Sequence, residues 1–131
     1  MINSRSHRRL ALPLLAVVLG VVLPAPAAFA AYDDCGTSGQ LCVYKNDDGS
    51  TGGVHQIPGN DSDWRDNPYF VGCTLNCKVN DNVSSVWNRE SYSVDMFIDV
   101  GYANNSVRAT AGQKRNITGS FNDALSSNKG V

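Results

Sequence analysis

The sequence has few of the residues on which enzymes and nucleic-acid-binding proteins depend. Only two of its 131 residues are histidines, and one of these, His7, lies near the N-terminus. No G-x-S-x-G, P-loop or dinucleotide-binding pattern occurs, and no pair of histidines is spaced as a metal motif requires. Lysine and arginine form no run after residue 30, which argues against nucleic acid as a partner. We therefore expect a protein that is not an enzyme.

The only long apolar run lies at the N-terminus. Residues 10–23 are apolar, follow a basic stretch, and precede an A-x-A sequence at residues 28–30. This pattern is typical of a secretory signal peptide, and the run is too short for a membrane anchor. We predict a signal peptide over residues 1–30, one domain over residues 31–131, and a secreted, extracellular protein with no membrane partner.

The predicted domain is small and mildly acidic. Its 101 residues are the size of one small domain. Three of the 11 basic residues fall in the signal peptide, so eight remain against 12 acidic residues, a net charge of −4. A mild acidic excess is compatible with calcium binding but does not demonstrate it.

Four cysteines lie in the predicted domain: Cys35, Cys42, Cys73 and Cys77. An even number in a short exported chain indicates disulfides. Zinc is disfavoured, because the spacings are unlike a zinc knuckle and His55 is the only histidine of the domain. Three pairings are open. We favour Cys35–Cys42 and Cys73–Cys77, which close the shortest loops, and each would stabilise the fold by about 2–3 kcal/mol.

The apolar residues of the domain come in short runs bounded by turn formers. Strand-like runs cover residues 41–44, 54–57, 83–87, 94–98 and 107–110. No long stripe with helical period appears, so the pattern predicts an all-β sandwich. A surface loop is expected over residues 60–68, with one helical turn around Trp64. We expect Trp64, Tyr69 and Phe70 to pin this loop to the core.

One short pattern, (N/D)-(N/D)-x-x-S-S, occurs twice, at residues 80–85 and 122–127. Each copy follows a strand, a polar hairpin, a second strand and a long connection, which indicates an internal duplication with Greek-key order. Carboxylate, amide and hydroxyl oxygens on a tight turn are the ligands that Ca²⁺ prefers. The same side chains also stabilise turns without metal by bonding to nearby backbone amides, so both interpretations stay open.

These residues resemble a known family. The paired turns, each preceded by an aromatic strand and a glycine-rich hairpin, resemble the microbial βγ-crystallins. Residues 41–53 together with residues 80–88 look like the small secreted actinobacterial proteins grouped as a peptidase-inhibitor family, whose founding type is a metalloproteinase inhibitor. The resemblance covers residues 35–128. It implies a βγ-crystallin-like sandwich of two Greek-key motifs and a secreted inhibitor with a peptidase, for example a metallopeptidase, as partner. The alternative is a calcium-binding βγ-crystallin module without inhibitory activity.

The resemblance also implies calcium as a cofactor. In calcium-binding βγ-crystallins the ligands come from the N-D-x-x-S-S turn of one half and the hairpin of the other. Carried onto this sequence, the ligands are Asn80, Asp81, Ser84, Asn122, Asp123, Ser126, Asp47 and Asp99. The hairpins depart from the family pattern: the first lacks its second aromatic residue, and the second has Asn104 in place of the usual glycine. The sequence leaves open which turn lies beside which hairpin.

The segment that contacts a peptidase is inferred from the cysteines. A disulfide between Cys73 and Cys77 would close Thr74, Leu75 and Asn76 into a small stiff loop, which loses little entropy on entering a cleft. Leu75 would then fill an apolar pocket of the enzyme. Three alternatives remain: the loop only staples a connection, Leu75 points into the core, or the acidic, aromatic loop of residues 61–70 makes the contact.

Overall fold

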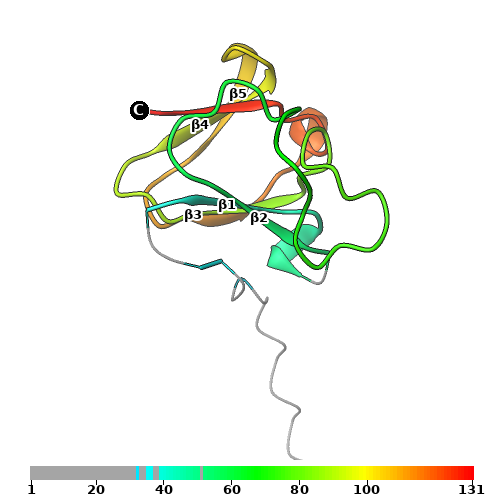
Figure 1. Cartoon of the computed structure of the whole chain (residues 1–131). Coiled ribbons are helices and arrows are strands. Elements are labelled where there is room, and N and C mark those ends of the chain that lie inside the picture. The colour runs from blue at the N-terminus through cyan, green and yellow to red at the C-terminus, as the bar shows by residue number, and fades with distance from the viewer. Residues whose placement is uncertain (1–31, 33–34, 37–38, 51) are drawn as a thin grey trace, which may run out of the picture.

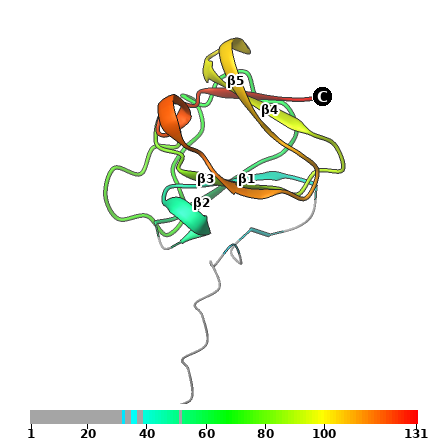
Figure 2. The ribbon, with the colours of Figure 1, turned by 180° about the vertical axis from the view of Figure 1, so that it is seen from behind.

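The computed structural model describes Tyr32 and residues 35–36, 39–50 and 52–131; the predicted signal peptide lies outside these ranges. Two antiparallel sheets face each other (Figures 1 and 2). The first sheet has the order β2-β1-β3-β6 and the second the order β5-β4-β7. The elements are β1 (Leu41–Tyr44), η2 (Asp47–Gly49), β2 (Val54–Ile57), β3 (Ser85–Asn88), β4 (Val94–Asp99), β5 (Ala103–Ala109), β6 (Lys114–Asn116), η3 (Gly119–Phe121) and β7 (Ser127–Gly130).

The two halves of the chain exchange strands between the sheets. β1, β2 and β3 come from the first half, and β6 from the second half pairs with β3. In return, Asp61 of the first half forms an antiparallel bridge to Asn128 of β7. The predicted β-sandwich with Greek-key order is confirmed, with two changes of detail: β5 begins earlier than expected, and β6 lies within a segment expected to be a connection.

The main core fills the space between the sheets. Alternate residues of the strands, including Leu41, Val43 and Met96, point into it. Trp64 is fully buried and Phe70 nearly so, which confirms that these two aromatic residues attach their loop to the core. Tyr69 was expected to do the same, but it is 58% exposed, because it belongs to a segment that stands away from the sheets. Around Trp64 the chain forms hydrogen-bonded turns rather than a helical turn.

A second, smaller cluster lies on the opposite face of the first sheet. Cys42 and Tyr44 alternate with the core residues of β1 and pack with Tyr32, Cys35 and Val54. As a result β1 is buried along its whole length on both faces. The disulfide Cys35–Cys42, with Cα atoms 5.9 Å apart, ties the N-terminal segment to this face.

The Tyr32 ring occupies the space beside Gly49, a residue of the first hairpin that has no side chain of its own. Its ring packs edge-on against Tyr44, with ring centroids 5.1 Å apart, and it is 6% exposed. Gly49 of η2 has φ +61°, and a Cβ built on it would lie 2.6 Å from the Tyr32 ring. In the second hairpin Tyr102 also has φ +61° and packs against Phe97, 6.0 Å away. The aromatic residue missing from the first hairpin is therefore supplied by Tyr32.

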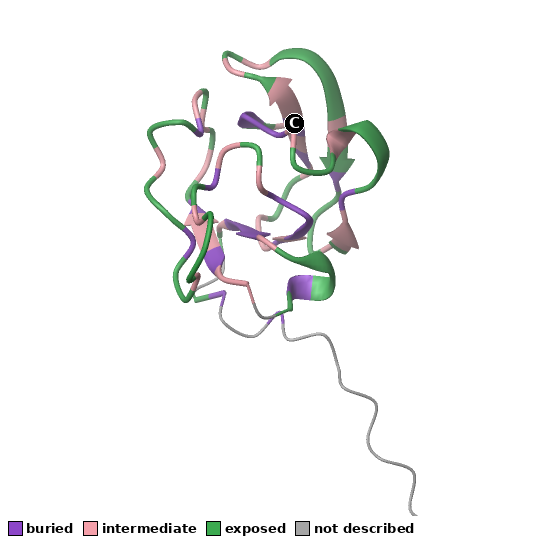
Figure 3. Cartoon of the chain, turned by 90° about the vertical axis from the view of Figure 1, so that its right-hand side faces the viewer, coloured by how far each residue is buried: buried purple, intermediate pink, exposed green. Residues whose placement is uncertain are grey.

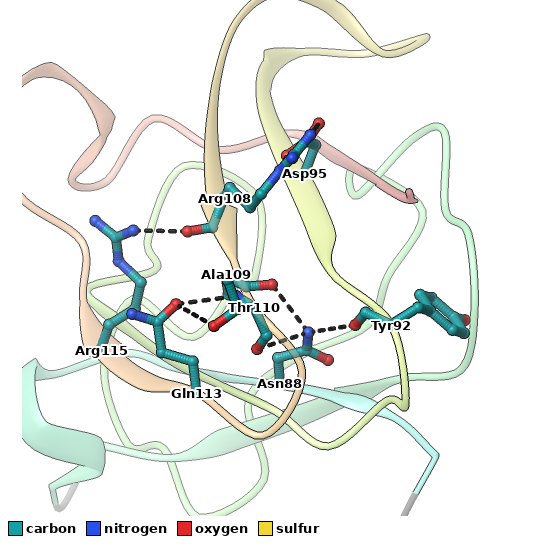
Figure 4. Close-up of polar contacts among 8 residues, drawn as sticks. All are labelled: Asn88, Tyr92, Asp95, Arg108, Ala109, Thr110, Gln113 and Arg115. Atoms are coloured by element: carbon teal, nitrogen blue, oxygen red, sulfur yellow. Dashed lines mark hydrogen bonds and ion pairs between the residues drawn. The ribbon is translucent and has the colours of Figure 1, made fainter.

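Asn88, at the end of β3, joins the two sheets. It is fully buried, and its Nδ2 donates to the carbonyls of Tyr92 (2.8 Å), Ala109 (3.0 Å) and Thr110 (3.1 Å), as Figure 4 shows. Its Oδ1 accepts from the backbone N of Glu90 at 3.0 Å. A single buried side chain thus hydrogen-bonds to four backbone groups where the ends of the strands meet, and one of them, the carbonyl of Thr110, also accepts from the backbone N of Gln113.

An ion pair lies beside this joint on the second sheet. Arg108 of β5 donates to both carboxylate oxygens of Asp95 on β4, at 2.7 and 2.8 Å, across directly paired positions (Figure 4). These hydrogen bonds, more than the charge itself, lower the pKa of the Asp95 carboxyl. Because the Arg108 side chain is largely exposed, we expect the pair to orient the strands more than it stabilises them.

Candidate functional site

The two N-D-x-x-S-S turns lie side by side and satisfy each other. Ser84 of the first turn donates to Asp123 of the second, and Ser126 of the second donates to Asp81 of the first, both at 3.3 Å. The main chains of the two turns are joined in the same way. The backbone N of Asp81 donates to the carbonyl of Leu125, and the backbone N of Asp123 donates to the carbonyl of Val83. Asp81 and Asp123 have φ +58° and +54°, so the two turns have the same backbone shape.

The last serine of each turn holds the hairpin of its own half. Ser85 Oγ donates to the carbonyl of Asn46 at 2.6 Å, and Ser127 Oγ donates to the carbonyl of Asp99 at 2.6 Å. Each serine also accepts a backbone N–H, from Gly49 in the first half and from Tyr102 in the second. The last residue of each turn, Ser85 or Ser127, therefore lies beside the hairpin of its own half, whereas the residue before it, Ser84 or Ser126, bonds to the turn of the other half. Which turn and hairpin would share a calcium ion stays a prediction.

Two of the turn residues fit a cation better than the rest. Asn80 Oδ1 is buried with no hydrogen-bond partner, and Asn80 and Asp81 line a hollow of about 340 Å³. Within the described part of the chain, no three His, Cys, Asp or Glu side chains gather as metal ligands. Any calcium here would therefore have at most two carboxylates beside amide, hydroxyl and main-chain oxygens, and Arg65 and Lys78 also line the hollow, so the site is a weak one.

The remaining predicted ligands are less well placed. In the first hairpin the residue bonded toward the second half is Asp48, which exchanges two hydrogen bonds with Asn116. Asp47 is exposed on the same short helix. In the second hairpin the carboxylate of Asp99 accepts from the amide of Asn104. Asn122 follows η3 and donates its backbone N to Gly119. These residues stay predictions as ligands.

His55 is a half-buried residue of β2. Burial lowers the pKa of its imidazole, and the nearby charge of Asp61 opposes this shift only in part. The side chain is half-buried, and a neutral imidazole is the form that such a site favours. A hydrogen bond with the backbone of Tyr69 acts in the same direction as the charge of Asp61 and raises the pKa.

The two halves differ by an insertion. Trp64 and Ile117 occupy equivalent positions in the two halves. The backbone N of Trp64 donates to the carbonyl of Ser126, and that of Ile117 donates to the carbonyl of Ser84. Sixteen positions separate Trp64 from Asn80, but only five separate Ile117 from Asn122. The first half therefore carries 11 extra residues between Trp64 and its turn, and the Cys73–Cys77 disulfide lies within them.

The inserted segment, which follows β2 and precedes β3 in the chain, projects from the side of the sandwich (Figure 1). Figure 3 looks at this side of the molecule, where long stretches of the chain are exposed. Its stem is held by backbone bonds: Phe70 N donates to Cys77 O at 2.9 Å, and Val71 pairs with Val54 at the edge of β2. Gly53, at φ +106°, allows this close approach, because a Cβ there would lie 2.8 Å from the Val71 carbonyl. The Cα atoms of the disulfide are 5.5 Å apart, as the shortest-loop pairing predicts.

The tip of the insertion exposes apolar side chains. Leu75 is 78% exposed, which excludes the alternative that it points into the core. Thr74 and Asn76 on either side are also exposed, and Asn76 adopts a left-handed backbone, φ +52°. Val71 and Tyr69 in the stem are likewise exposed. Trp64, in contrast, is fully buried and is not available for contact from the loop of residues 61–70.

The geometry defines a class of protein, and comparison with solved structures agrees. The chain is similar to a βγ-crystallin from Ciona intestinalis, with 25% identity and TM-score 0.55 over 71% of this chain and 100% of that one. It is also similar to a βγ-crystallin domain from Flavobacterium johnsoniae, with 22% identity and TM-score 0.53 over 70% and 92%. A structure described under the evolution of the eye lens βγ-crystallin domain fold has 24% identity and TM-score 0.58 over 74% and 89%. The fold is that of a βγ-crystallin domain.

Residues 28–110 match peptidase inhibitor family I36, and the chain belongs to this family. Membership identifies a binding protein of the inhibitor class rather than an enzyme. A comparison with curated proteins finds no match. Within the described residues no helix is both long and apolar enough to cross a membrane.

Proposed function

We propose that this protein is exported and inhibits an extracellular peptidase by placing the Cys73–Cys77 loop in the enzyme's cleft. The observation that carries the proposal is the insertion: 11 residues that the second half does without, closed by a disulfide and ending in an exposed leucine. The fold does not need this segment, so its apolar tip calls for another explanation. Family membership supplies the class of partner.

The loop has the physical properties of an inhibitory contact. A disulfide across three residues, with a hydrogen-bonded stem below it, holds the main chain before the enzyme arrives. A pre-shaped loop loses little conformational entropy on binding, so more of its contact energy appears as affinity. Leu75 would fill an apolar pocket, and the neighbouring main-chain groups would pair with a strand of the enzyme. The resemblance to a metalloproteinase inhibitor supports a metallopeptidase as target.

The test is a titration of the exported, oxidised protein against thermolysin, a zinc metallopeptidase, and subtilisin, a serine peptidase. Burying one leucine contributes about 1.5–3 kcal/mol, so Leu75→Ala should raise the inhibition constant roughly tenfold to a hundredfold. Val71→Ala is the matched control, because Val71 is 74% exposed but lies in the stem. Full inhibition by Leu75→Ala would exclude this loop as the contact, and inhibition of no peptidase would leave the calcium-binding module.

We propose calcium binding as a second property, because Asn80 Oδ1 lacks a partner beside Asp81. Asn80, Asp81 and Ser126 would hold the ion at one turn, and Ser84 and Asp123 are the equivalent pair at the other. A bound ion would replace hydrogen bonds with stronger contacts to the same oxygens and so brace the two turns against each other. With so few carboxylates, the affinity should be that of weak extracellular modules, on the order of 10⁻⁴ to 10⁻³ M.

A further inference from the structure

The Cys73–Cys77 loop packs against the core at Cys73, but its tip stands over a hollow. The hollow has a volume of about 420 Å³ and separates the loop from the first hairpin. Its walls include Lys45, Asn46, Gly52, Gly53, Val71 and Thr74. Since Leu75 and its two neighbours are exposed, side-chain packing does not fix the shape of the tip. The loop must be held by specific ties.

Besides the disulfide and the backbone bonds of the stem, two side-chain hydrogen bonds join the loop to the body of the protein. Asn76 Nδ2 donates to Asn82 Oδ1 at 3.0 Å, within the first N-D-x-x-S-S turn. On the other side Lys45 Nζ donates to the carbonyl of Leu75 itself. Lys45 directly follows β1, and its backbone N donates to Gly53 O at 3.2 Å, so the base of this side chain belongs to the rigid sheet.

We propose that Lys45 is a positioning residue of the inhibitory loop, which rests on the function proposed above. Its ammonium group is a charge-assisted donor. By holding the Leu75 carbonyl it fixes the direction in which the Leu75 side chain leaves the loop. A loop held in this way also resists distortion toward the transition state of peptide hydrolysis, to which a peptidase is complementary. Lys45 therefore contributes both to affinity and to resistance of the loop to cleavage.

Three variants test the role of Lys45. Lys45→Met keeps the apolar stem of the side chain and removes the donor, and Lys45→Arg restores a charged donor. Lys129→Met is the control, because it removes the same charge at a site on the other sheet, where Lys129 Nζ lies 5.8 Å from the centroid of the Tyr102 ring. We expect Lys45→Met to raise the inhibition constant about tenfold, as for one charged hydrogen bond. Its loop should be hydrolysed faster by the target enzyme, while Lys45→Arg and Lys129→Met behave as wild type.

The outcomes separate this inference from the proposed function. If the wild type inhibits and Lys45→Met inhibits equally well with no faster cleavage, Lys45 does not position the loop. If the wild type inhibits neither thermolysin nor subtilisin, the proposed function fails for both classes. Hydrogen–deuterium exchange at residues 74–76 then still decides the structural part: faster exchange in Lys45→Met supports the tie, and equal exchange overturns it.

Discussion

Tyr32 and position 49 cannot both carry a ring in the same space, and this leads to a quantitative prediction. Tyr102 fills the aromatic place of the second hairpin from within the hairpin, whereas Tyr32 reaches the first hairpin from the N-terminal segment. A side chain at Gly49 would begin 2.6 Å from the Tyr32 ring. Tyr102 shows that a tyrosine is tolerated at this hairpin position with φ +61°. A tyrosine placed at position 49 should therefore harm the wild type and help a variant that lacks Tyr32.

The magnitudes follow from burial. Replacing a fully packed aromatic residue by alanine costs about 3–5 kcal/mol. Tyr32→Ala should cost less, about 2–4 kcal/mol, because its cluster lies on the outer face of one sheet. Gly49→Tyr in the wild type should cost about 1–3 kcal/mol through overpacking, plus roughly 1 kcal/mol for a left-handed residue with a side chain. In the double variant the overpacking disappears and the new ring packs against Tyr44, a pair that contributes about 0.5–1.5 kcal/mol beyond its area.

The assay is a double-mutant cycle that measures the free energy of unfolding in urea for the wild type, the two single variants and the double variant. The slope of this free energy against urea concentration must be the same for all four proteins. We expect a coupling of at least about 2 kcal/mol in favour of the double variant. Tyr69→Ala is the control for loss of a tyrosine, because Tyr69 is exposed and should change stability by less than about 0.5 kcal/mol. If Gly49→Tyr has the same effect with and without Tyr32, the two residues do not share one place and the reasoning is wrong.

Three further predictions concern the joint, the histidine and the turns. Asn88→Ala should lower the free energy of unfolding by about 2–4 kcal/mol, since it removes four hydrogen bonds to the backbone, while the Thr110 carbonyl keeps its hydrogen bond from the backbone N of Gln113; a loss below about 1 kcal/mol in urea unfolding would contradict this. Because burial lowers the pKa of His55, its contribution to stability is complete above its ordinary pKa of about 6.5 and lost as pH falls through the lowered value. His55→Gln should flatten the plot of the free energy of unfolding against pH in this range. Parallel plots for the wild type and the variant would show that His55 does not cause the pH dependence. Millimolar calcium should raise the thermal midpoint of the wild type more than that of Asp81→Ala, and calorimetry without heat for either protein would mean that the turns bind no metal.

The strands and turns were predictable because their signals are local. Apolar alternation, the boundaries set by turn formers and the repeated N-D-x-x-S-S pattern can all be recognised within a few residues. β6 was missed for the same reason: Lys114, Arg115 and Asn116 carry no apolar alternation, and they form a strand only because β3 offers an open edge. Tyr69 was misplaced because a large aromatic residue usually belongs to a core, and the sequence gives no sign that it stands on a projecting stem.

The exchange between the turns had no local signal at all. Ser84 and Asp123 are 39 positions apart and meet only after both halves have folded. The insertion, in contrast, could have been found from spacing. The hairpins repeat at a distance of 53 residues, from Gly49 to Tyr102, whereas the turns repeat at 42, from Asn80 to Asn122. The difference of 11 between the two repeat distances is the length of the extra segment.

The reciprocal bonds between the turns have a consequence for how such a molecule can arise or be divided. Each half has one serine hydroxyl and one aspartate carboxylate whose partners lie in the other half. A chain with only one half would leave both groups, and the edge of its sheet where β6 now lies, without partners. A second copy related by a two-fold axis would supply all of them, because each surface is complementary to itself. A chain with a single motif would therefore be stable only as a homodimer, whereas two motifs in one chain make the stability independent of concentration.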